Sequence, residues 1–328
     1  MPGLQIRRTE RPAPGFQRDV PDDVVAAACE EAFGAGAVRA ATATTTGTYN
    51  VTFRLDLADG GEAYLRFAPE ESSQGAADRH AMRNEHAATP FVAVLGPLVA
   101  RTVAVDFTHR LVARDWVVHT AVPGVPASDV LLDDAGRDAF HRNLGAVCAT
   151  LHTVRGDGFG RALAPVHPRW SDAVAEDVAA LAADARSAGV DPTLVARTEA
   201  AVPKHADALD VVRVPALLHG DLWRPNVLLA PGTARITGVL DHDAARWGDP
   251  RAEWAWSRIR IAGAAAEAAF RAGYGDTADD DAASVRDAVY DLRHTLAIRL
   301  DIDRRGLDRS QIPPEHWALE PRLAALGC

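Results

Sequence analysis

The segment of residues 217–229, which reads LLHGDLWRPNVLL, constrains the fold of this chain more than any other segment. Two apolar runs enclose a short polar stretch that contains His219, Asp221 and Asn226. Short apolar runs bounded by turn residues are typical of buried strands. We therefore expect a buried scaffold that presents an acid and an amide on the loop between the two runs.

A second acid, Asp241, lies 20 residues after Asp221 and follows the strand-like run of residues 235–240. Pro231 and Gly232 mark a turn between this run and the first segment. The interval has room for a strand, a turn and a returning strand, so we expect Asp241 and Asp221 to converge at one end of a hairpin. Each of these residues alone also fits a turn, a loop amide or a cap. Their order on a predicted hairpin favours a common site.

The order H-x-D-L-x-x-x-N at residues 219–226 is typical of a kinase catalytic loop, in which the Asp accepts a proton from the attacking hydroxyl and the Asn holds a metal ion. Several protein-kinase features are missing. Gly220 replaces the Arg that reads a phosphorylated activation loop, and DHD at residues 241–243 replaces D-F-G. GDP at residues 248–250 follows so closely that no activation loop or A-P-E segment fits between them. We therefore expect a small-molecule acceptor and constitutive activity, not a protein kinase.

These two segments resemble the signature segments of the aminoglycoside phosphotransferase-like small-molecule kinases, which are relatives of protein kinases and include antibiotic, choline, homoserine and fructosamine kinases. The resemblance covers about residues 24–265 and is specific in its second half. It implies an α+β, two-lobed, protein-kinase-like fold, with a β-rich N-lobe built on an antiparallel sheet and a mainly helical C-lobe. It also implies that Asp221 is the catalytic base, that Asn226 and Asp241 bind Mg²⁺, and that His219 and Asp249 brace the loop.

The order of predicted elements agrees with two lobes in the 328 residues. Residues 51–57 alternate with period two, a turn follows at residues 59–61, and residues 63–67 return as a strand. After the Pro/Gly-rich linker of residues 122–126 the pattern becomes mainly helical. We expect an N-lobe at residues 1–121 that binds nucleotide, with a flexible arm to about residue 16. The C-lobe then spans residues 122–328 and carries the catalytic loop and the substrate-binding helices.

The nucleotide site is expected on the N-lobe. A turn containing Thr45, Thr46, Gly47 and Thr48 lies where the family places its phosphate-covering loop, and its N–H and hydroxyl groups suit the β- and γ-phosphates. A Thr/Gly turn is also common in hairpins that bind nothing. No Walker A sequence is present.

Arg66 stands where protein kinases have the strand lysine that contacts the α- and β-phosphates. The chain has a single lysine, Lys204, in the predicted helical lobe, so arginine has to fill this role. Glu85, on the next predicted helix, is the expected ion-pair partner of Arg66, although both residues also fit an exposed surface. The purine edge is expected at the backbone of Val118, His119, Thr120 and Ala121, where nothing separates ATP from GTP.

The substrate is the least determined feature. Asp243 is a candidate hydrogen-bond acceptor, and Asp291 and Asp301 of the helical tail would suit a cationic antibiotic, although the same acids fit a solvated helix face. Trp254, like Trp256 and Trp317, is a candidate for stacking on a sugar or base. An uncharged nucleoside or macrolide therefore also stays open.

These patterns predict a phosphotransferase that uses ATP or GTP and Mg²⁺ to phosphorylate a hydroxyl of an antibiotic, in resistance or self-resistance. The alternatives are a metabolic kinase of the fructosamine, sugar, homoserine or choline type, and a kinase-like protein that binds nucleotide without turnover. The net charge of −10 argues against a nucleic-acid partner. Three cysteines without C-x-x-C spacing, and the lack of a signal region or an apolar span, predict a cytoplasmic protein without membrane contact, as a monomer or homodimer.

Overall fold

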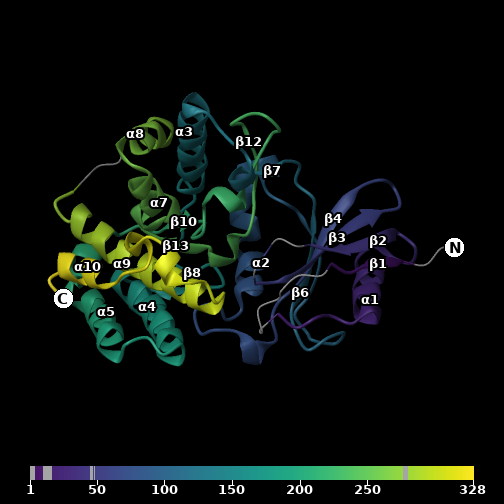
Figure 1. The fold of residues 1–328 in the computed structure, drawn as a ribbon, viewed down its shortest axis with the longest axis horizontal. Coiled ribbons are helices and arrows are strands. Elements are labelled where there is room, and N and C mark those ends of the chain that lie inside the picture. Colours follow the sequence, from purple (N-terminus) through teal and green to yellow (C-terminus); the bar gives the residue numbers. More distant parts are fainter. Residues whose placement is uncertain (1–3, 10–16, 45–46, 48, 276–279) are drawn as a thin grey trace.

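The computed structural model describes residues 4–9, 17–44, 47, 49–275 and 280–328. The chain forms a β-rich lobe and a larger, mainly helical lobe, which lie side by side in Figure 1. This arrangement agrees with the α+β, two-lobed fold expected from the sequence. The expected loop residues Thr45, Thr46 and Thr48 lie outside the described residues.

The N-lobe is built on a six-stranded sheet with the strand order β1-β2-β3-β4-β6-β5. All neighbouring strands are antiparallel except β1 and β2, which are parallel. Helix α1 (Asp22–Phe33) covers one face of the sheet, and α2 (Ala81–Val92) lies on the other. The strands are β1 (Gln5–Arg7), β2 (Val38–Ala43), β3 (Val51–Leu57), β4 (Glu62–Phe67), β5 (Thr102–Asp106) and β6 (Trp116–Thr120).

Side chains of β4 point alternately to the core of the N-lobe, on the α1 side, and to the α2 side of the sheet. Leu65 and Phe67 are fully buried among the residues that pack against α1. Successive side chains of a strand point to opposite faces, so Arg66 points to the α2 side. The period-two pattern therefore places one basic residue at the cleft while its neighbours fill the core.

The N-terminal segment is not a loose arm where the structure describes it. Strand β1 pairs in parallel with β2, and Leu4 and Ile6 pack against the N-lobe core. Arg8 forms ion pairs with Asp19 and Asp22. The expectation of a flexible arm is therefore wrong for these residues, because alternating apolar residues and an arginine tie them to the sheet and to α1. Residues 10–16 lie outside the described part of the chain.

The C-lobe combines helices with two small sheets, whose strand orders are β10-β13-β8-β9 and β12-β11-β7. The sequence predicts most of the helices, but not the hairpin of β8 and β9 or the strand β13. The α-helices are α3 (Asp134–Leu151), α4 (Trp170–Ser187), α5 (Pro192–Lys204), α6 (Ala206–Leu209), α7 (Trp254–Ala262), α8 (Ala264–Tyr274), α9 (Ala283–Arg304) and α10 (Glu320–Ala325).

Short strands and 3₁₀ turns connect these helices. The strands are β7 (Val125–Pro126), β8 (Phe159–Arg161), β9 (Ala164–His167), β10 (Ala216–Leu218), β11 (Val227–Leu229), β12 (Ile236–Val239) and β13 (Arg246–Gly248). The 3₁₀ turns are η1 (Glu71–Ser73), η2 (Ala93–Leu98), η3 (Ala127–Asp129), η4 (Arg224–Asn226), η5 (His242–Ala244), η6 (Pro250–Ala252), η7 (Arg309–Gln311) and η8 (Pro314–His316).

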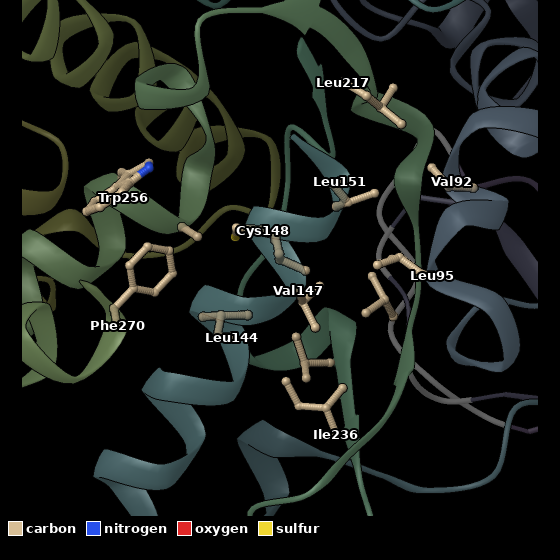
Figure 2. Packing of buried hydrophobic residues seen from close by; sticks show 14 of the residues in the cluster. Val92, Leu95, Leu144, Val147, Cys148, Leu151, Leu217, Ile236, Trp256 and Phe270 are labelled. Atoms are coloured by element: carbon tan, nitrogen blue, oxygen red, sulfur yellow. The ribbon is translucent and has the colours of Figure 1, made fainter. Parts of the chain in front are cut away.

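The largest core cluster joins the two lobes. Leu144 and Leu151 lie on the apolar stripe of α3, at the spacing of an amphipathic helix, and belong to the same cluster as Leu217 and Phe270 (Figure 2). Val92 at the end of α2 and Leu95 in η2 belong to the same cluster (Figure 2). The C-terminal end of α2 is therefore fixed to the C-lobe by buried apolar contacts.

Candidate active site

The two acids converge because β11 and β12 form an antiparallel hairpin. Val227 pairs with Val239, and the N–H of Leu240 donates to the carbonyl of Asn226 at 2.9 Å. Asp241 follows directly, in the left-handed region with φ 63° and ψ 55°. The hairpin expected from the sequence is present, and it brings Asn226 and Asp241 to the same end.

The acid and the amide of the loop between β10 and β11 contact each other. The Nδ2 group of Asn226 donates to the Oδ2 atom of Asp221 at 2.8 Å and to its main-chain carbonyl at 2.9 Å. Both bonds use the amide nitrogen, so they do not commit the amide oxygen, which is the atom that binds hard cations. The loop therefore holds Asp221 in place while leaving a metal-binding oxygen available.

The electrostatics of this end of the hairpin favour a cation. Burial, together with the nearby charge of Asp241, raises the pKa of Asp221 well above its usual range. Oxygen atoms of a carboxylate and an amide are suitable ligands for Mg²⁺, which takes few protein ligands and completes its shell with water and phosphate. Asn226 and Asp241 thus fit such an ion. The part of the chain that the structure describes holds no cluster of three or more His, Cys, Asp or Glu residues arranged for a metal.

Arg66 links both lobes at the cleft. Its Nη1 atom donates to both carboxylate oxygens of Glu85 at 2.8 Å, and its Nη2 atom donates to the Oδ1 atom of Asp241 at 2.6 Å. Burial disfavours the ionised form of Glu85, but the Arg66 charge outweighs it and lowers the pKa of Glu85 to about 2. The Arg66–Glu85 pair expected from the sequence is present. The additional contact with Asp241 was not expected.

Asn84, which the sequence analysis missed, ties α2 to the segment after Asp241. It is fully buried, and its Nδ2 group donates to the carbonyls of Asp243 at 2.7 Å and Ala245 at 2.9 Å. Its Oδ1 atom accepts from the N–H of Leu163 at 2.8 Å. The available signal was an amide adjacent to Glu85 on a helix that the sequence predicts. The neighbouring residues Asn84 and Glu85 thus tie α2 to residues of both lobes.

Glu253 braces the catalytic loop. Its carboxylate is fully buried and accepts from the N–H groups of His219 at 2.7 Å and Gly220 at 3.1 Å. The expectation that Asp249 has this role is wrong. Asp249 instead accepts from the Arg286 guanidinium and the Tyr290 hydroxyl, both at 2.8 Å, because it faces α9. The available signal for Glu253 was an acid placed between the apolar residues Ala252 and Trp254.

His219 and Gly220 set the backbone of the loop. Burial lowers the pKa of His219 to about 4, so its ring is neutral, and its Nδ1 atom accepts from the N–H of Asp221 at 3.4 Å. Gly220 has φ 82°, and a Cβ atom there would lie 2.3 Å from the carbonyl oxygen of Ala244. Only glycine fits this close approach. The residue that distinguishes this loop from that of protein kinases is therefore also required by packing.

The expected purine contact needs correction. Strand β6 lies between β4 and β5, so its backbone is used in the sheet. The N–H of Thr120 donates to Arg101 at 2.9 Å, and the N–H of Ala121 donates to Glu62 at 3.2 Å. These two N–H groups therefore do not serve a purine. The carbonyl groups of Val118 to Ala121 stay a prediction, as does the loop at Gly47, which has φ 92°.

The four residues expected to contact the substrate have different environments in the structure. Asp243 lies at the hairpin end, where burial and the charge of Asp241 raise its pKa well above the usual range. Trp254 is only 8% exposed, and its ring packs against His294 with centroids 4.7 Å apart, so it does not stack on a ligand. Asp291 pairs with Arg260 at 2.6 Å, and Asp301 pairs with Arg304 at 2.9 Å. These ion pairs weaken the case for Asp291 and Asp301 as binding sites for a cation.

No helix among the described residues is both long and apolar enough to cross a membrane.

Comparisons with known proteins identify a family and similar folds. Residues 41–292 match the model of a family described as the phosphotransferase enzyme family. A thermostable mutant of the aminoglycoside phosphotransferase APH(4)-Ia, in ternary complex with ADP and hygromycin B, is similar at 20% identity, with a TM-score of 0.60 over 92% of this chain and 96% of that chain.

Two further solved structures share the fold. The macrolide 2'-phosphotransferase MphH from Brachybacterium faecium is 20% identical, with a TM-score of 0.55 over 93% of this chain and 98% of that chain. APH(2")-IIia in complex with GDP and kanamycin is 16% identical, with a TM-score of 0.60 over 90% of this chain and 96% of that chain. These similarities confirm the two-lobed fold expected from the sequence.

Proposed function

The chain belongs to the phosphotransferase enzyme family, and on that premise we propose that it transfers the γ-phosphoryl group of ATP or GTP to a hydroxyl group of a small molecule. One observation carries the proposal most directly. Asp221, Asn226 and Asp241 meet at one end of the β11–β12 hairpin, opposite Arg66 of the N-lobe. A base, a pair of hard-cation ligands and a phosphate-binding arginine are the groups that phosphoryl transfer requires.

Each residue has a distinct role in the proposed reaction. Asp221 orients the acceptor hydroxyl and accepts its proton as the oxygen attacks phosphorus, while Asn226 keeps the carboxylate aligned. Asn226 and Asp241 would hold Mg²⁺, which would neutralise charge on the β- and γ-phosphates. Arg66 donates to the α- and β-phosphates, and Glu85 keeps its guanidinium in position. Catalysis of this kind is mostly positioning and charge stabilisation.

In this proposal the nucleotide lies between two segments of the N-lobe. One is the loop of Thr45, Thr46, Gly47 and Thr48, and the other is the C-terminal end of β6. The N–H groups and hydroxyls of the loop cover the phosphates, and the carbonyl groups of residues 118–121 accept from the purine. The similar structures include complexes with ADP and with GDP, which supports a purine nucleotide donor and leaves both bases open. We infer that the protein works in the cytoplasm, where both donors are present, as a monomer or homodimer.

The acceptor that we propose is an antibiotic, inactivated in resistance or self-resistance. Similar structures contain hygromycin B and kanamycin, and a further one is a macrolide phosphotransferase. The alternative is a metabolic acceptor such as a fructosamine, a sugar, homoserine or choline. Asp243, which lies beside Asp241 at the hairpin end, is the one member of the expected substrate set that stays in the proposal as a contact of the acceptor.

The experiment that tests the function measures Mg²⁺-dependent release of ADP or GDP against a panel of aminoglycosides, macrolides, nucleoside antibiotics and hydroxylated metabolites. Asp221→Asn should lower the rate by roughly 10²–10⁴-fold for the accepted compound while nucleotide affinity is retained. The exposed acid Asp157 gives a control, because Asp157→Asn should leave the rate unchanged. Wild-type turnover in Asp221→Asn would disprove the mechanism. Nucleotide binding without any phosphorylated product would favour the non-catalytic alternative.

A further inference from the structure

A small cavity lies beside the catalytic loop, on the side of Gly220. Its other lining residues come from α4, β13, η6 and α9, and include Asp177, Arg246, Arg293 and His294. It leaves about 20 Å³ for the centre of a water-sized group, so it admits one small polar group and not a sugar ring. The chemistry of its walls therefore decides which terminal group of a ligand fits there.

The walls carry two guanidinium groups that share one acid. The Oδ2 atom of Asp177 accepts from Arg246 Nη1 and from Arg293 Nε, both at 2.6 Å. Arg246 Nε also donates to the carbonyl of Ala244 at 3.3 Å. Within the described residues, these bonds leave Arg246 Nη2 and both terminal nitrogens of Arg293 without a hydrogen-bond acceptor. Both side chains line the cavity and are 15% exposed, so neither arginine is sealed in the core.

The local charge is positive. The single negative charge of Asp177 neutralises only one of the two positive charges of Arg246 and Arg293. His294, which also lines the cavity, is 5% exposed, and its Nδ1 atom has no hydrogen-bond partner in the described parts of the chain. Burial and the charges of Arg293, Arg260 and Arg246 hold the pKa of His294 well below its usual range, so its ring is neutral. A cationic group would find no unpaired acid here, whereas an anionic group would meet unused donors.

We propose that Arg246 and Arg293 form a subsite for a carboxylate or another small oxyanion group carried by the acceptor. Guanidinium groups bind such groups through paired, charge-assisted hydrogen bonds. Gly220 lines the cavity and directly precedes the proposed base Asp221, so the cavity borders the catalytic loop. The inference rests on the proposed function and narrows it: among the antibiotic and metabolic acceptors proposed above, it selects hydroxy compounds that carry an anionic group over polycations such as aminoglycosides.

The first test measures binding without catalysis. Malonate binding is followed by calorimetry at constant ionic strength, with malonamide as the uncharged analogue. Wild type should bind malonate and not malonamide, and Arg293→Gln should weaken malonate binding by roughly 10- to 100-fold. Glutamine can still donate to Asp177, so the fold is retained, and a melting curve checks this. Arg137→Gln on the surface of α3 is the matched control, since this arginine is 50% exposed, and it should bind malonate as wild type does.

The second test uses acceptors in matched pairs, each a hydroxy acid and its amide. Wild type should show a kcat/KM for the acid at least 10-fold above that for the amide, and Arg293→Gln and Arg246→Gln should abolish this preference. ADP affinity should not change in either variant. The subsite would be overturned if the variants lost kcat/KM equally for the acid and the amide, or if they also lost affinity for ADP. A preference of wild type for a polycationic acceptor would overturn it as well.

The two tests separate this subsite from the proposed function. Malonate binding lost in Arg293→Gln, with no acceptor phosphorylated by wild type, would uphold the anion subsite and contradict the kinase function. Phosphorylation of an acceptor with no malonate binding and no acid preference would uphold the kinase function and contradict the subsite.

Discussion

The side-chain amide of Asn84 in α2 donates to the main-chain carbonyl of Asp243 in the C-lobe, at 2.7 Å. The neighbouring residue Glu85 reaches Asp241 through Arg66. In protein kinases, regulation works by moving the helix that carries the corresponding Glu. Here the buried amide and the apolar contacts of Val92 hold that helix in place. This fixed position agrees with a chain that lacks an activation loop.

Replacing Asn84 by Ala should therefore damage both stability and rate. The carbonyls of Asp243 and Ala245 and the N–H of Leu163 would lose a buried partner, which we expect to cost about 2–4 kcal/mol of unfolding free energy. Because the segment around Asp241 loses its anchor, kcat should fall about 10-fold under conditions where the variant is folded.

Asn143→Ala is the matched control for Asn84→Ala. Asn143 donates to one carbonyl, that of Ala234, away from the cleft. Urea unfolding should show a smaller loss of about 1 kcal/mol, and kcat should not change. A wild-type kcat in Asn84→Ala would refute the positioning role.

The forked shape of Arg66 should matter more than its charge. Its two terminal nitrogens contact Glu85 and Asp241 separately, and a lysine ammonium cannot reproduce this planar fork. We expect Arg66→Lys to raise KM for the nucleotide about 10-fold, with a smaller change in kcat. Arg54→Lys on the neighbouring strand is the control, because its ion pairs with Asp56 and Glu62 are exposed. Steady-state kinetics at varied nucleotide concentration measures both; unchanged KM in Arg66→Lys would argue against a phosphate contact.

The sequence predicts those parts of the site that depend on nearby residues. Asp221 and Asn226 lie on the loop that leads into β11, and Asp241 directly follows β12, so the spacing of a hairpin was sufficient to predict that they converge. The Arg66–Glu85 pair follows from a strand and the next helix. In both cases the partners are close along the chain, and local periodicity decides their direction.

Contacts between distant segments could not be predicted in the same way. Asn84 meets Asp243 across 159 residues, and nothing in local periodicity indicates such a pairing. Asp249 and Glu253 are both buried acids near the same segment, and only the packing of α9 decides that Glu253 is the one that contacts the loop. Trp254 shows a related ambiguity, since an aromatic residue on an amphipathic helix can face a ligand or the core.

Gly220 should not tolerate even alanine. Its positive φ is unfavourable for any other residue, and the added Cβ would collide with the carbonyl oxygen of Ala244 at 2.3 Å. We expect Gly220→Ala to lower kcat by at least about 100-fold, because Asp221 would shift relative to Asp241, and to cost roughly 2–4 kcal/mol of stability.

Gly232→Ala separates backbone strain from this collision. Gly232 also has a positive φ, 69°, but an added Cβ there would meet no atom within 4 Å. Its replacement should cost about 1 kcal/mol and leave kcat unchanged. Paired measurements of urea unfolding and turnover decide the matter, and equal effects of the two substitutions on kcat would refute the steric argument.

Ionised Asp177 should stabilise the folded protein at neutral pH, and this stabilisation should be lost in acid. Burial disfavours its ionised form, but Arg246 and Arg293 outweigh this and lower its pKa. A lowered folded-state pKa means that the stabilisation is fully present above the unfolded-state pKa of about 3.9 and is lost as the pH falls towards the folded-state value. Asp177→Asn should therefore lose roughly 3 kcal/mol at pH 7 and at pH 5, because two arginines lose their shared acid.

Below about pH 4 the difference between wild type and Asp177→Asn should shrink, because Asp177 is then protonated in the unfolded wild type while it stays ionised in the folded state, which lowers the free energy of unfolding of the wild type. Urea unfolding at pH 7, 5 and 3.5 measures the difference, and Asp157→Asn at an exposed position serves as the reference. A gap that widens on acidification would show that Asp177 is not the ionised partner of Arg246 and Arg293. In that case the positive charge assigned to the neighbouring cavity would have to be reassessed, because it depends on one carboxylate shared between two guanidinium groups.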